Sequence, residues 1–209
     1  MKGVLLKDFY IAKSNVLAII VSLIVLGFGL SILVEPSALL ILAPAVSTTA
    51  VFVSITSDAA SKWNKNVITM PVSRSQIILE KFIFYILLAM VGLITALIPC
   101  IVLMLTGENI TVHSLWLYAT LGLSSAFLAG CVSLPCAYIF DPEKSQIVFM
   151  MSFMVSTAII VGLVFLVNLF ISVKNNDLLT FNIILAISLV FFFISYRIAV
   201  AVYQNRDIV

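Results

Sequence analysis

The sequence predicts an all-α, polytopic membrane protein with six transmembrane helices. The chain of 209 residues is 63% hydrophobic and 10% charged, with a mean hydropathy of +1.27. A chain this apolar cannot bury its side chains in one core and still present a polar surface to water. Its apolar runs lack the alternation of barrel strands, and backbone amides in hydrocarbon must be hydrogen-bonded within each span. We therefore interpret the runs as helices.

Apolar runs long enough to cross a bilayer, roughly 20 residues each, recur along the chain. They cover Val16–Val34, Ala38–Ser57, Phe82–Thr106, Leu115–Phe140, Ile147–Val173 and Leu178–Tyr196. The first run could in isolation be a signal peptide, because lysines precede it. However, it is about 19 residues long, and Val34-Glu35-Pro36 is a poor cleavage site. We therefore predict a span there as well.

The basic residues predict which ends of the spans face the cytoplasm. With a cytoplasmic N-terminus, only Lys174 lies in an outer loop, and the other ten of the eleven basic residues lie inside: Lys2, Lys7, Lys13, Lys62, Lys65, Arg74, Lys81, Lys144, Arg197 and Arg206. This asymmetry follows the positive-inside rule, so both termini are predicted to be cytoplasmic. The net charge of +2 indicates no nucleic-acid partner, and we interpret the basic residues as topology determinants beside anionic membrane lipid.

The whole chain is predicted to form one transmembrane domain. Its parts are an interfacial elbow helix at 1–15, spans one and two at 16–57, a cytoplasmic coupling element at 58–81, spans three to six at 82–201 and a cytoplasmic tail at 202–209. The elbow stretch places Leu5, Phe9 and Ala12 on one helical stripe, which predicts a helix lying at the membrane surface.

The link between the second and third spans is the longest connection in the chain. It covers the 24 residues 58–81, whereas neighbouring helices of a bundle are usually joined by roughly 2 to 8. Pro71 stops any helix that comes from Trp63, and Ser73 and Gln76 form an S-x-x-Q capping box for a new helix that continues into the third span. The link is either an interfacial hairpin anchored by Trp63 and lysines or a docking surface for a cytoplasmic partner.

The interiors of the predicted spans hold no Asp, Glu, Lys, Arg or His. Such residues in a membrane usually mark proton relays or ion sites, so their absence argues against a proton-driven antiporter and leaves no catalytic residue to name. The three cysteines lie in apolar runs, where a thiol packs as a small hydrophobe, and they indicate neither a disulfide nor a metal site.

The fourth span carries Gly122, Ala126 and Gly130 at four-residue spacing. Small residues at this spacing let another helix approach closely, so we predict a helix-packing face there.

The chain contains no phosphate-binding loop of the form G-x-x-x-x-G-K-[ST]. We therefore expect it to be neither an enzyme nor a nucleotide-binding protein, and to bind no cofactor. If it moves a solute uphill, a separate subunit must supply the energy.

Three features together carry a family resemblance. They are the opening Met1–Tyr10 (MKGVLLKDFY), the six spans, and the stretch Thr69-Met70-Pro71-Val72-Ser73-Arg74 between the second and third spans. On these the chain resembles, over essentially its whole length, the membrane subunit of a bacterial ATP-binding-cassette (ABC) exporter of the small type-2 permease kind, which works beside a separate ATPase. It departs from that pattern after the second span, where an acidic pair is common but Ala59 follows Asp58.

In such families the elbow and the link meet the ATPase. The resemblance therefore implies ATPase-coupling roles here for Asp58, Trp63, Lys65, Pro71, Ser73 and Arg74. It also implies two membrane subunits, either two copies of this chain or this chain with a homologue, and two ABC ATPase subunits that bind ATP and Mg²⁺. The location would be the bacterial cell membrane and the cargo an amphipathic or hydrophobic molecule, such as a peptide, an antimicrobial compound or a lipid, moved outward.

Two other classes of protein stay open from the sequence. One is the substrate-binding membrane subunit of a vitamin-type uptake system, which has a similar length and number of spans. The other is a membrane scaffold with no transport role. An ATPase encoded beside this chain would favour the exporter.

Overall fold

A computed structural model confirms the all-α, six-span fold. It describes residues 2–30, 35–61, 63, 73–106, 110–140, 145–170, 172 and 176–204. Six helices of this part of the chain are long and apolar enough to cross a membrane. They are α1 (Lys2–Leu30), α2 (Leu39–Ala60), α4 (Arg74–Leu105), α5 (Val112–Ile139), α6 (Ser145–Phe170) and α7 (Asp177–Gln204), with a short 3₁₀ helix η1 (Pro36–Ala38) before α2.

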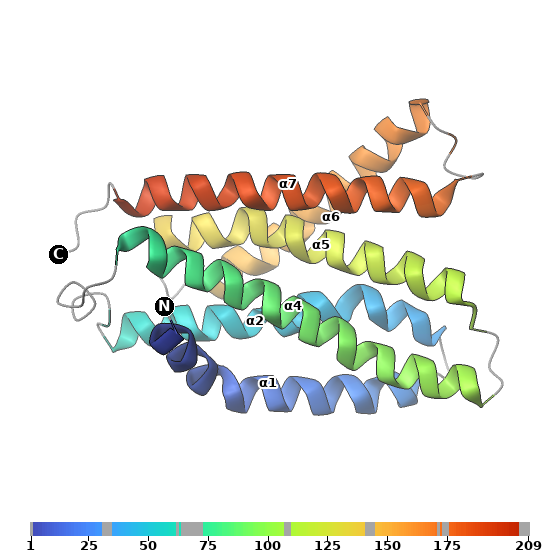
Figure 1. The fold of residues 1–209 in the computed structure, drawn as a ribbon, viewed down its shortest axis with the longest axis horizontal. Helices are drawn as coiled ribbons and strands as arrows, with labels where there is room; N and C mark the ends of the chain where they lie inside the picture. The colour runs from blue at the N-terminus through green and yellow to red at the C-terminus, as the bar shows by residue number, and fades with distance from the viewer. Residues whose placement is uncertain are drawn as a thin grey trace.

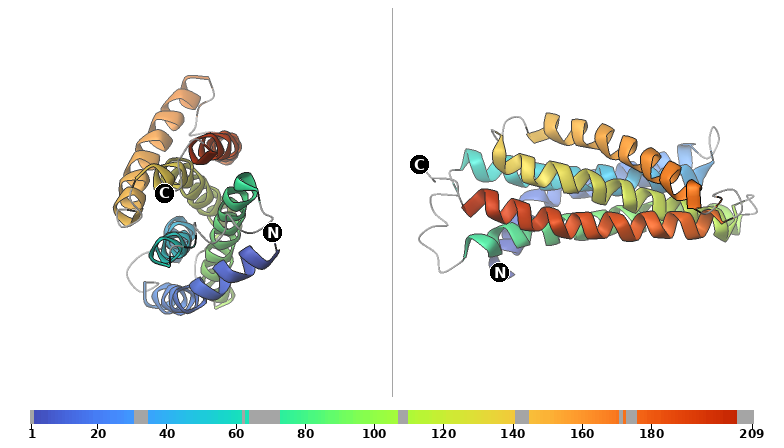
Figure 2. Two further views of the ribbon diagram at one scale, coloured as in Figure 1. Left: turned by 90° about the vertical axis from the view of Figure 1, so that its left-hand side faces the viewer. Right: turned by 90° about the horizontal axis from the view of Figure 1, so that it is seen from above.

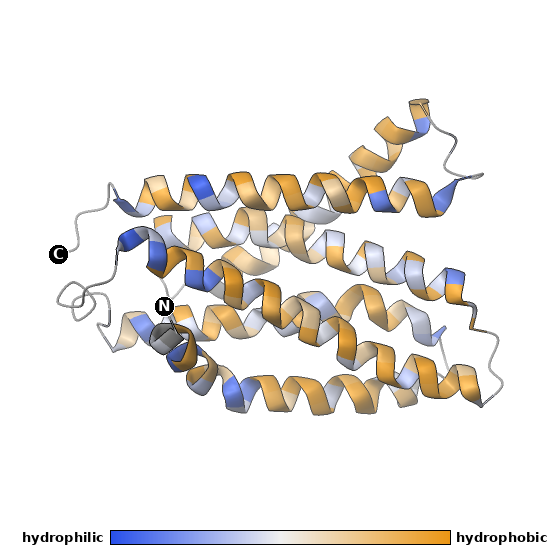
Figure 3. Cartoon of the chain, in the orientation of Figure 1, coloured by the Kyte–Doolittle hydropathy of each residue, from blue (hydrophilic) through white to orange (hydrophobic). Residues whose placement is uncertain are grey.

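The helices lie side by side in an elongated bundle (Figure 1). The first turns of α1, the end of α2, the start of α4 and the end of α7 lie at one end, which we call the link end because the chain from α2 to α4 connects there. Helix α5 packs against α2, α4, α6 and α7. Helix α6 is tilted against its neighbours (Figure 2). Apolar residues cover most of each helix, and the most hydrophilic residues gather toward the helix ends (Figure 3).

Helix α1 differs from the prediction in its length and in its buried face. The chain is one uninterrupted helix from Lys2 to Leu30, although its first turns are inclined to the remainder (Figure 1). The predicted stripe was wrong at Phe9, which is 48% exposed, while Asp8 and Ala12 are fully buried. The cause is that Asp8 has charged partners on α2 and α4, so this side of the helix turns inward.

Both ends of the link are helical. Helix α2 continues to Ala60 and α4 begins at Arg74, so both ends of the predicted element at 58–81 belong to helices. The predicted capping box is confirmed: the Gln76 amide donates to Ser73 Oγ at 3.3 Å, and the Ser73 amide donates to Gln76 Oε1 at 3.2 Å. Helix α7 likewise runs past the predicted boundary at 201 and ends at Gln204.

The small-residue face of α5 is buried against two other helices. A Cβ atom on Gly122 would lie 2.1 Å from the Leu40 carbonyl oxygen of α2, and one on Gly130 would lie 2.7 Å from the Tyr85 ring of α4. Between them, the Ala126 carbonyl accepts a hydrogen bond of 2.6 Å from the Tyr85 hydroxyl. Helix α5 therefore approaches α2 and α4 so closely that two of these positions have no room for a side chain.

Polar contacts also join the helices at the end opposite the link end. The Tyr118 hydroxyl of α5 donates to Glu35 before η1 at 3.1 Å, and His113 Nε2 of α5 lies 3.3 Å from Asp177 Oδ1 of α7. His113 thus has a carboxylate neighbour that is remote in sequence.

Candidate functional site: a charge cluster at the link end

Four charged side chains and one hydroxyl meet inside the bundle at the link end. We call them the charge cluster: Lys7 and Asp8 of α1, Ser54 and Asp58 of α2, and Lys81 of α4. Asp8 and Ser54 are fully buried, and Asp58 and Lys81 are 7% and 4% exposed. Charged side chains are rarely buried to this degree unless they are paired, and here the pairing joins three helices.

Lys81 lies at the centre of the charge cluster. Its Nζ donates to Asp8 Oδ2 at 2.6 Å, to Asp58 Oδ2 at 2.7 Å and to Ser54 Oγ at 2.8 Å. An ammonium group has three donors, so all three are used. One side chain of α4 is therefore bonded to both α1 and α2.

The two carboxylates are satisfied in the same way. Ser54 Oγ donates to Asp8 Oδ1 at 2.7 Å, and Lys7 Nζ lies 3.3 Å from the same oxygen while donating to Asp58 Oδ1. Each carboxylate thus contacts both ammonium groups, and the four charges cancel. Removing one member of such a group leaves a buried charge without its partner, at a cost of about 3–5 kcal/mol.

Helical periodicity explains why these residues meet. Ser54 and Asp58 are one turn apart on α2 and so face the same neighbour. Lys81 follows the buried residues Ile77 and Ile78 by four and three positions, which places it on the inward face of α4. Asp8 is one turn before the buried Ala12 of α1. Each charged group therefore lies on the buried face of its helix, in line with buried apolar residues.

Sequence reasoning found Asp58 but missed Lys7, Asp8, Ser54 and Lys81 as site residues. The predicted first and third spans begin after these charges, since hydropathy assigns charged residues to the membrane surface. A signal for Lys81 was nevertheless present: the capping box at Ser73 already predicted a helix that runs through Lys81 into the span.

The charge cluster contains a second acidic residue beside Asp58, although Ala59 follows Asp58 in the sequence. The second carboxylate beside Asp58 does not come from the next residue of α2 but from Asp8 of α1, and both carboxylates contact Lys81. The pair of acids is thus assembled in space from two helices.

Two further predicted coupling residues lie near the charge cluster or at the start of α4. The ring of Trp63 lies beneath Lys7, whose Nζ is 4.3 Å from the ring centroid, a cation–π arrangement. Ser73 caps α4. Predicted positions Lys65 and Pro71 lie outside the described residues.

Arg74 connects the start of α4 to a fourth helix. Its Nη1 donates to the Gln204 carbonyl oxygen at 3.0 Å, in the last turn of α7. Carbonyls at a helix C-terminus have no partner within the helix, and a cation there also interacts favourably with the helix dipole. The first turns of α4 are therefore bonded to α1, α2 and α7.

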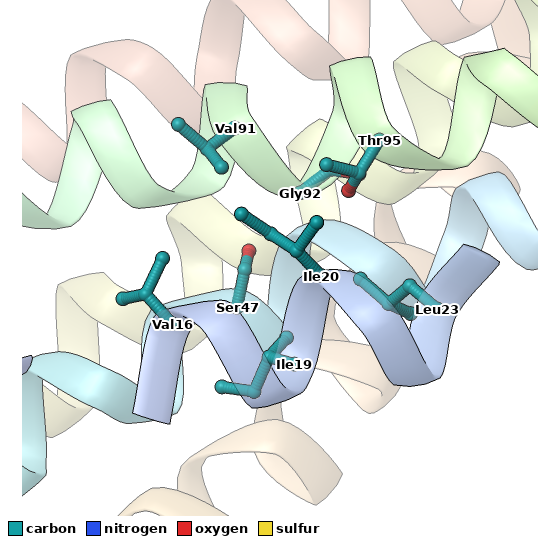
Figure 4. A pocket seen from close by; sticks show the side chains of 8 residues that line it. All are labelled: Val16, Ile19, Ile20, Leu23, Ser47, Val91, Gly92 and Thr95. Atoms are coloured by element: carbon teal, nitrogen blue, oxygen red, sulfur yellow. The ribbon is translucent and has the colours of Figure 1, made fainter. Parts of the chain in front are cut away.

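A second feature, a crevice between α1, α2 and α4, carries no comparable chemistry (Figure 4). It is lined by Val16, Ile19, Ile20, Leu23, Ser47, Val91, Gly92 and Thr95, and has no room for a water molecule. The hydroxyl groups that line it already have hydrogen-bond partners. Ser47 Oγ donates to the Leu88 carbonyl oxygen at 2.8 Å, and Thr95 Oγ1 donates to the Gly92 carbonyl oxygen. The crevice is a packing seam.

No group of three His, Cys, Asp or Glu side chains within the described ranges is placed to hold a metal ion.

The fold and the charge cluster define a polytopic helical membrane protein. Its buried charged residues lie at the end of the bundle where the link between α2 and α4 connects. The chain belongs to the ABC-2 transporter family: a family model described as "ABC-2 family transporter protein" matches residues 3–204. No curated protein and no solved structure gave a significant match. Members of this family are membrane subunits that work with an ATP-binding subunit.

Proposed function

We propose that this chain is the permease subunit of an ABC exporter of the bacterial cell membrane. In this proposal both termini and the link end are cytoplasmic, a separate subunit binds ATP and Mg²⁺, and the chain itself binds no cofactor. Its cargo is amphipathic or hydrophobic, such as a peptide, an antimicrobial compound or a lipid, and moves outward. Membership of the ABC-2 family and the basic residues at the link end support this assignment.

The observation that carries the proposal is the bonding of both ends of the link to α1. Asp58 lies two residues before the end of α2, and Lys81 lies in the second turn of α4. Their side chains contact each other at 2.7 Å, and Lys81 contacts Asp8 at 2.6 Å. A force that an ATPase exerts on the link would therefore act on three helices together, rather than on one flexible loop.

Two more contacts extend this coupling path. Trp63, just beyond α2, packs on Lys7 of the charge cluster, and Arg74 bonds α4 to the end of α7. We therefore propose Asp58, Trp63, Ser73 and Arg74 as coupling residues, with Lys65 and Pro71 between them in the link.

The outer faces of the bundle are apolar surfaces that membrane lipid and a second permease can cover. Of an apolar 18-residue stretch in each of α1, α6 and α7, only 17%, 11% and 28% are buried inside the chain, and the large exposed side chains of these helices are mostly apolar. We propose that membrane lipid and a second permease, either another copy or a homologue, cover them, and that the cargo path lies between the two permeases.

The first experiment is purification of the tagged chain from its native membrane in mild detergent, followed by mass spectrometry and an ATPase assay. A stoichiometric ABC ATPase that is active in the complex is expected. A lone, inactive chain would overturn the exporter assignment and favour a scaffold or an uptake-binding subunit. For the cargo, amphipathic peptides should stimulate the ATPase of the complex in lipid nanodiscs. Stimulation by small polar solutes instead would contradict this cargo class.

The role of the link end is tested separately with Arg74→Glu. This reversal should weaken assembly with the ATPase and reduce cargo-stimulated ATP hydrolysis, whereas Arg74→Lys, which keeps the charge and a donor for Gln204, should retain both. Because Arg74 also bonds α7, thermal unfolding of each variant shows whether the fold is intact. If Arg74→Glu assembles and hydrolyses ATP like the wild type, Arg74 is not a coupling residue.

A further inference from the structure

Glu80 is a buried carboxyl group that the charge cluster does not include. It lies on α4 next to Lys81 and is 2% exposed. Its Oε1 atom is shielded from solvent and has no hydrogen-bond partner, and no described residue forms a salt bridge with it. Glutamate is among the residues least often buried without a partner.

The described neighbours of Glu80 cannot neutralise it. Lys7 and Lys81 act on it electrostatically, but so do Asp8 and Asp58, and the two ammonium groups are already shared between those two carboxylates. Tyr138 of α5, also within electrostatic range of Glu80, carries no charge that could help, and Tyr203 of α7 stacks on the Tyr138 ring with centroids 5.5 Å apart. If Glu80 were ionised, the described residues of the site would hold one uncompensated negative charge.

A buried, unpaired carboxylate is far more costly than a buried neutral acid. The missing positive charge could be a metal ion or a proton. A metal ion needs several ligands, and Glu80 does not form a group of three candidate ligands with Asp8 and Asp58 in the described part of the chain. A proton needs only the carboxyl group itself.

We propose that Glu80 is a proton-binding site and carries a proton at neutral pH in the folded chain. The region around Lys81 is then electrically neutral, with two ammonium groups, two carboxylates and one carboxylic acid. The proton stays as long as α1, α2 and α4 keep water out, and it leaves when these helices separate and the carboxyl group is hydrated. This inference concerns the folded chain and does not depend on its partners.

Infrared spectroscopy of the full chain in lipid nanodiscs at neutral pH tests the proposal, because a protonated carboxyl group has a C=O stretch separate from that of a carboxylate. We expect this acid band in the wild type and its loss in Glu80→Gln. The matched control is Glu35→Gln, the same change at an exposed carboxyl group, which should leave the band unchanged. A wild-type spectrum without the band, or a band that survives Glu80→Gln, would overturn the proposal.

If Glu80→Gln does not fold, isotope labelling decides the question in a chain that keeps Glu80. The chain has three other glutamates, Glu35, Glu108 and Glu143. With these changed to Gln and the remaining glutamate labelled with ¹³C in its carboxyl group, the acid band should move to lower frequency. An acid band that does not move belongs to another residue and refutes the assignment.

Stability provides an independent readout with a defined sign. If the folded chain holds a proton that the unfolded chain releases at neutral pH, the unfolded state binds fewer protons, and stability falls as pH rises. Unfolding of the wild type should show this decrease across neutral pH, and Glu80→Gln should lack that part of it. A wild type and a variant with the same slope would contradict a bound proton.

Discussion

The ammonium group of Lys81 and the carboxylate of Asp8 lie 2.6 Å apart, although the two residues are 73 positions apart in the sequence. Both are almost fully removed from solvent. The pair connects α4 to the segment that was expected to lie at the membrane surface. It therefore makes the start of α1 an integral part of the bundle.

Removing Lys81 should destabilise the chain strongly. Lys81→Met keeps the length and packing of the side chain but leaves Asp8 and Asp58 with too little positive charge, so we expect a loss of about 3–5 kcal/mol. Equilibrium unfolding in detergent measures it. Lys13→Met, at an exposed position of α1, is the control and should have little effect; equal stability of the two variants would show that the charge cluster contributes nothing.

The contact between Asp8 and Lys81 should appear as a coupling energy. In a double-mutant cycle, Asp8→Asn combined with Lys81→Met leaves Lys7 and Asp58 as a balanced pair, so the double variant should be less destabilised than the two single changes added together. The difference should be about 0.5–3 kcal/mol, the range seen for directly interacting residues. Additive effects would mean that the two groups do not stabilise each other.

Gly122→Ala should destabilise the packing of α5 on α2. The added Cβ would lie 2.1 Å from the Leu40 carbonyl oxygen, a backbone atom that cannot move without shifting α2, and overpacking of this kind costs about 1–3 kcal/mol. The matched control is Gly162→Ala on α6, where nothing lies within 4 Å of the new Cβ. Thermal unfolding should separate the two, with Gly162→Ala equal to the wild type or slightly more stable because alanine favours helix.

Ser73→Ala should loosen the first turn of α4. The loss of its cap to the Gln76 amide costs about 1 kcal/mol, and the effect should be local. Hydrogen exchange of the first α4 amides should become faster, while Ser73→Asp, which can still accept the same hydrogen bond, should exchange like the wild type. Unchanged exchange in Ser73→Ala would show that the contacts of Arg74 alone hold this helix start.

The sequence predicted the helices better than it predicted what joins them. The six spans and the cap at Ser73 follow from local information, namely apolar runs of the required length and a four-residue motif. The charge cluster depends on which helices are neighbours, because Asp8, Asp58 and Lys81 come from three separate elements. Periodicity could have shown that each continues a buried stripe, but only the packing of α1 against both α2 and α4 brings them together.

The sequence did not single out Glu80 for the same reason, since its surroundings depend on which helices are neighbours. In the sequence it is the acidic neighbour of a basic residue in a polar link, where a solvated ion pair is the natural expectation. In the structure Lys81 donates all of its hydrogen bonds to residues of two other helices. It therefore does not pair with the carboxyl group of Glu80.

Lys81 and Asp58 are 23 positions apart, and the hydrogen bond between them is 2.7 Å long. It closes the intervening chain into a ring, and the two residues at the base of this ring are held in the helix bundle. This bond, and not the length of the connection, sets the spacing of α2 and α4 at this base. The entropy of closing a flexible loop grows slowly, by about 0.6 kcal/mol for each doubling of its length. Changes in the number of residues between the end of α2 at Ala60 and the cap of α4 at Ser73 are therefore inexpensive, and related chains can vary the length of this segment to match different partners without rebuilding the membrane domain.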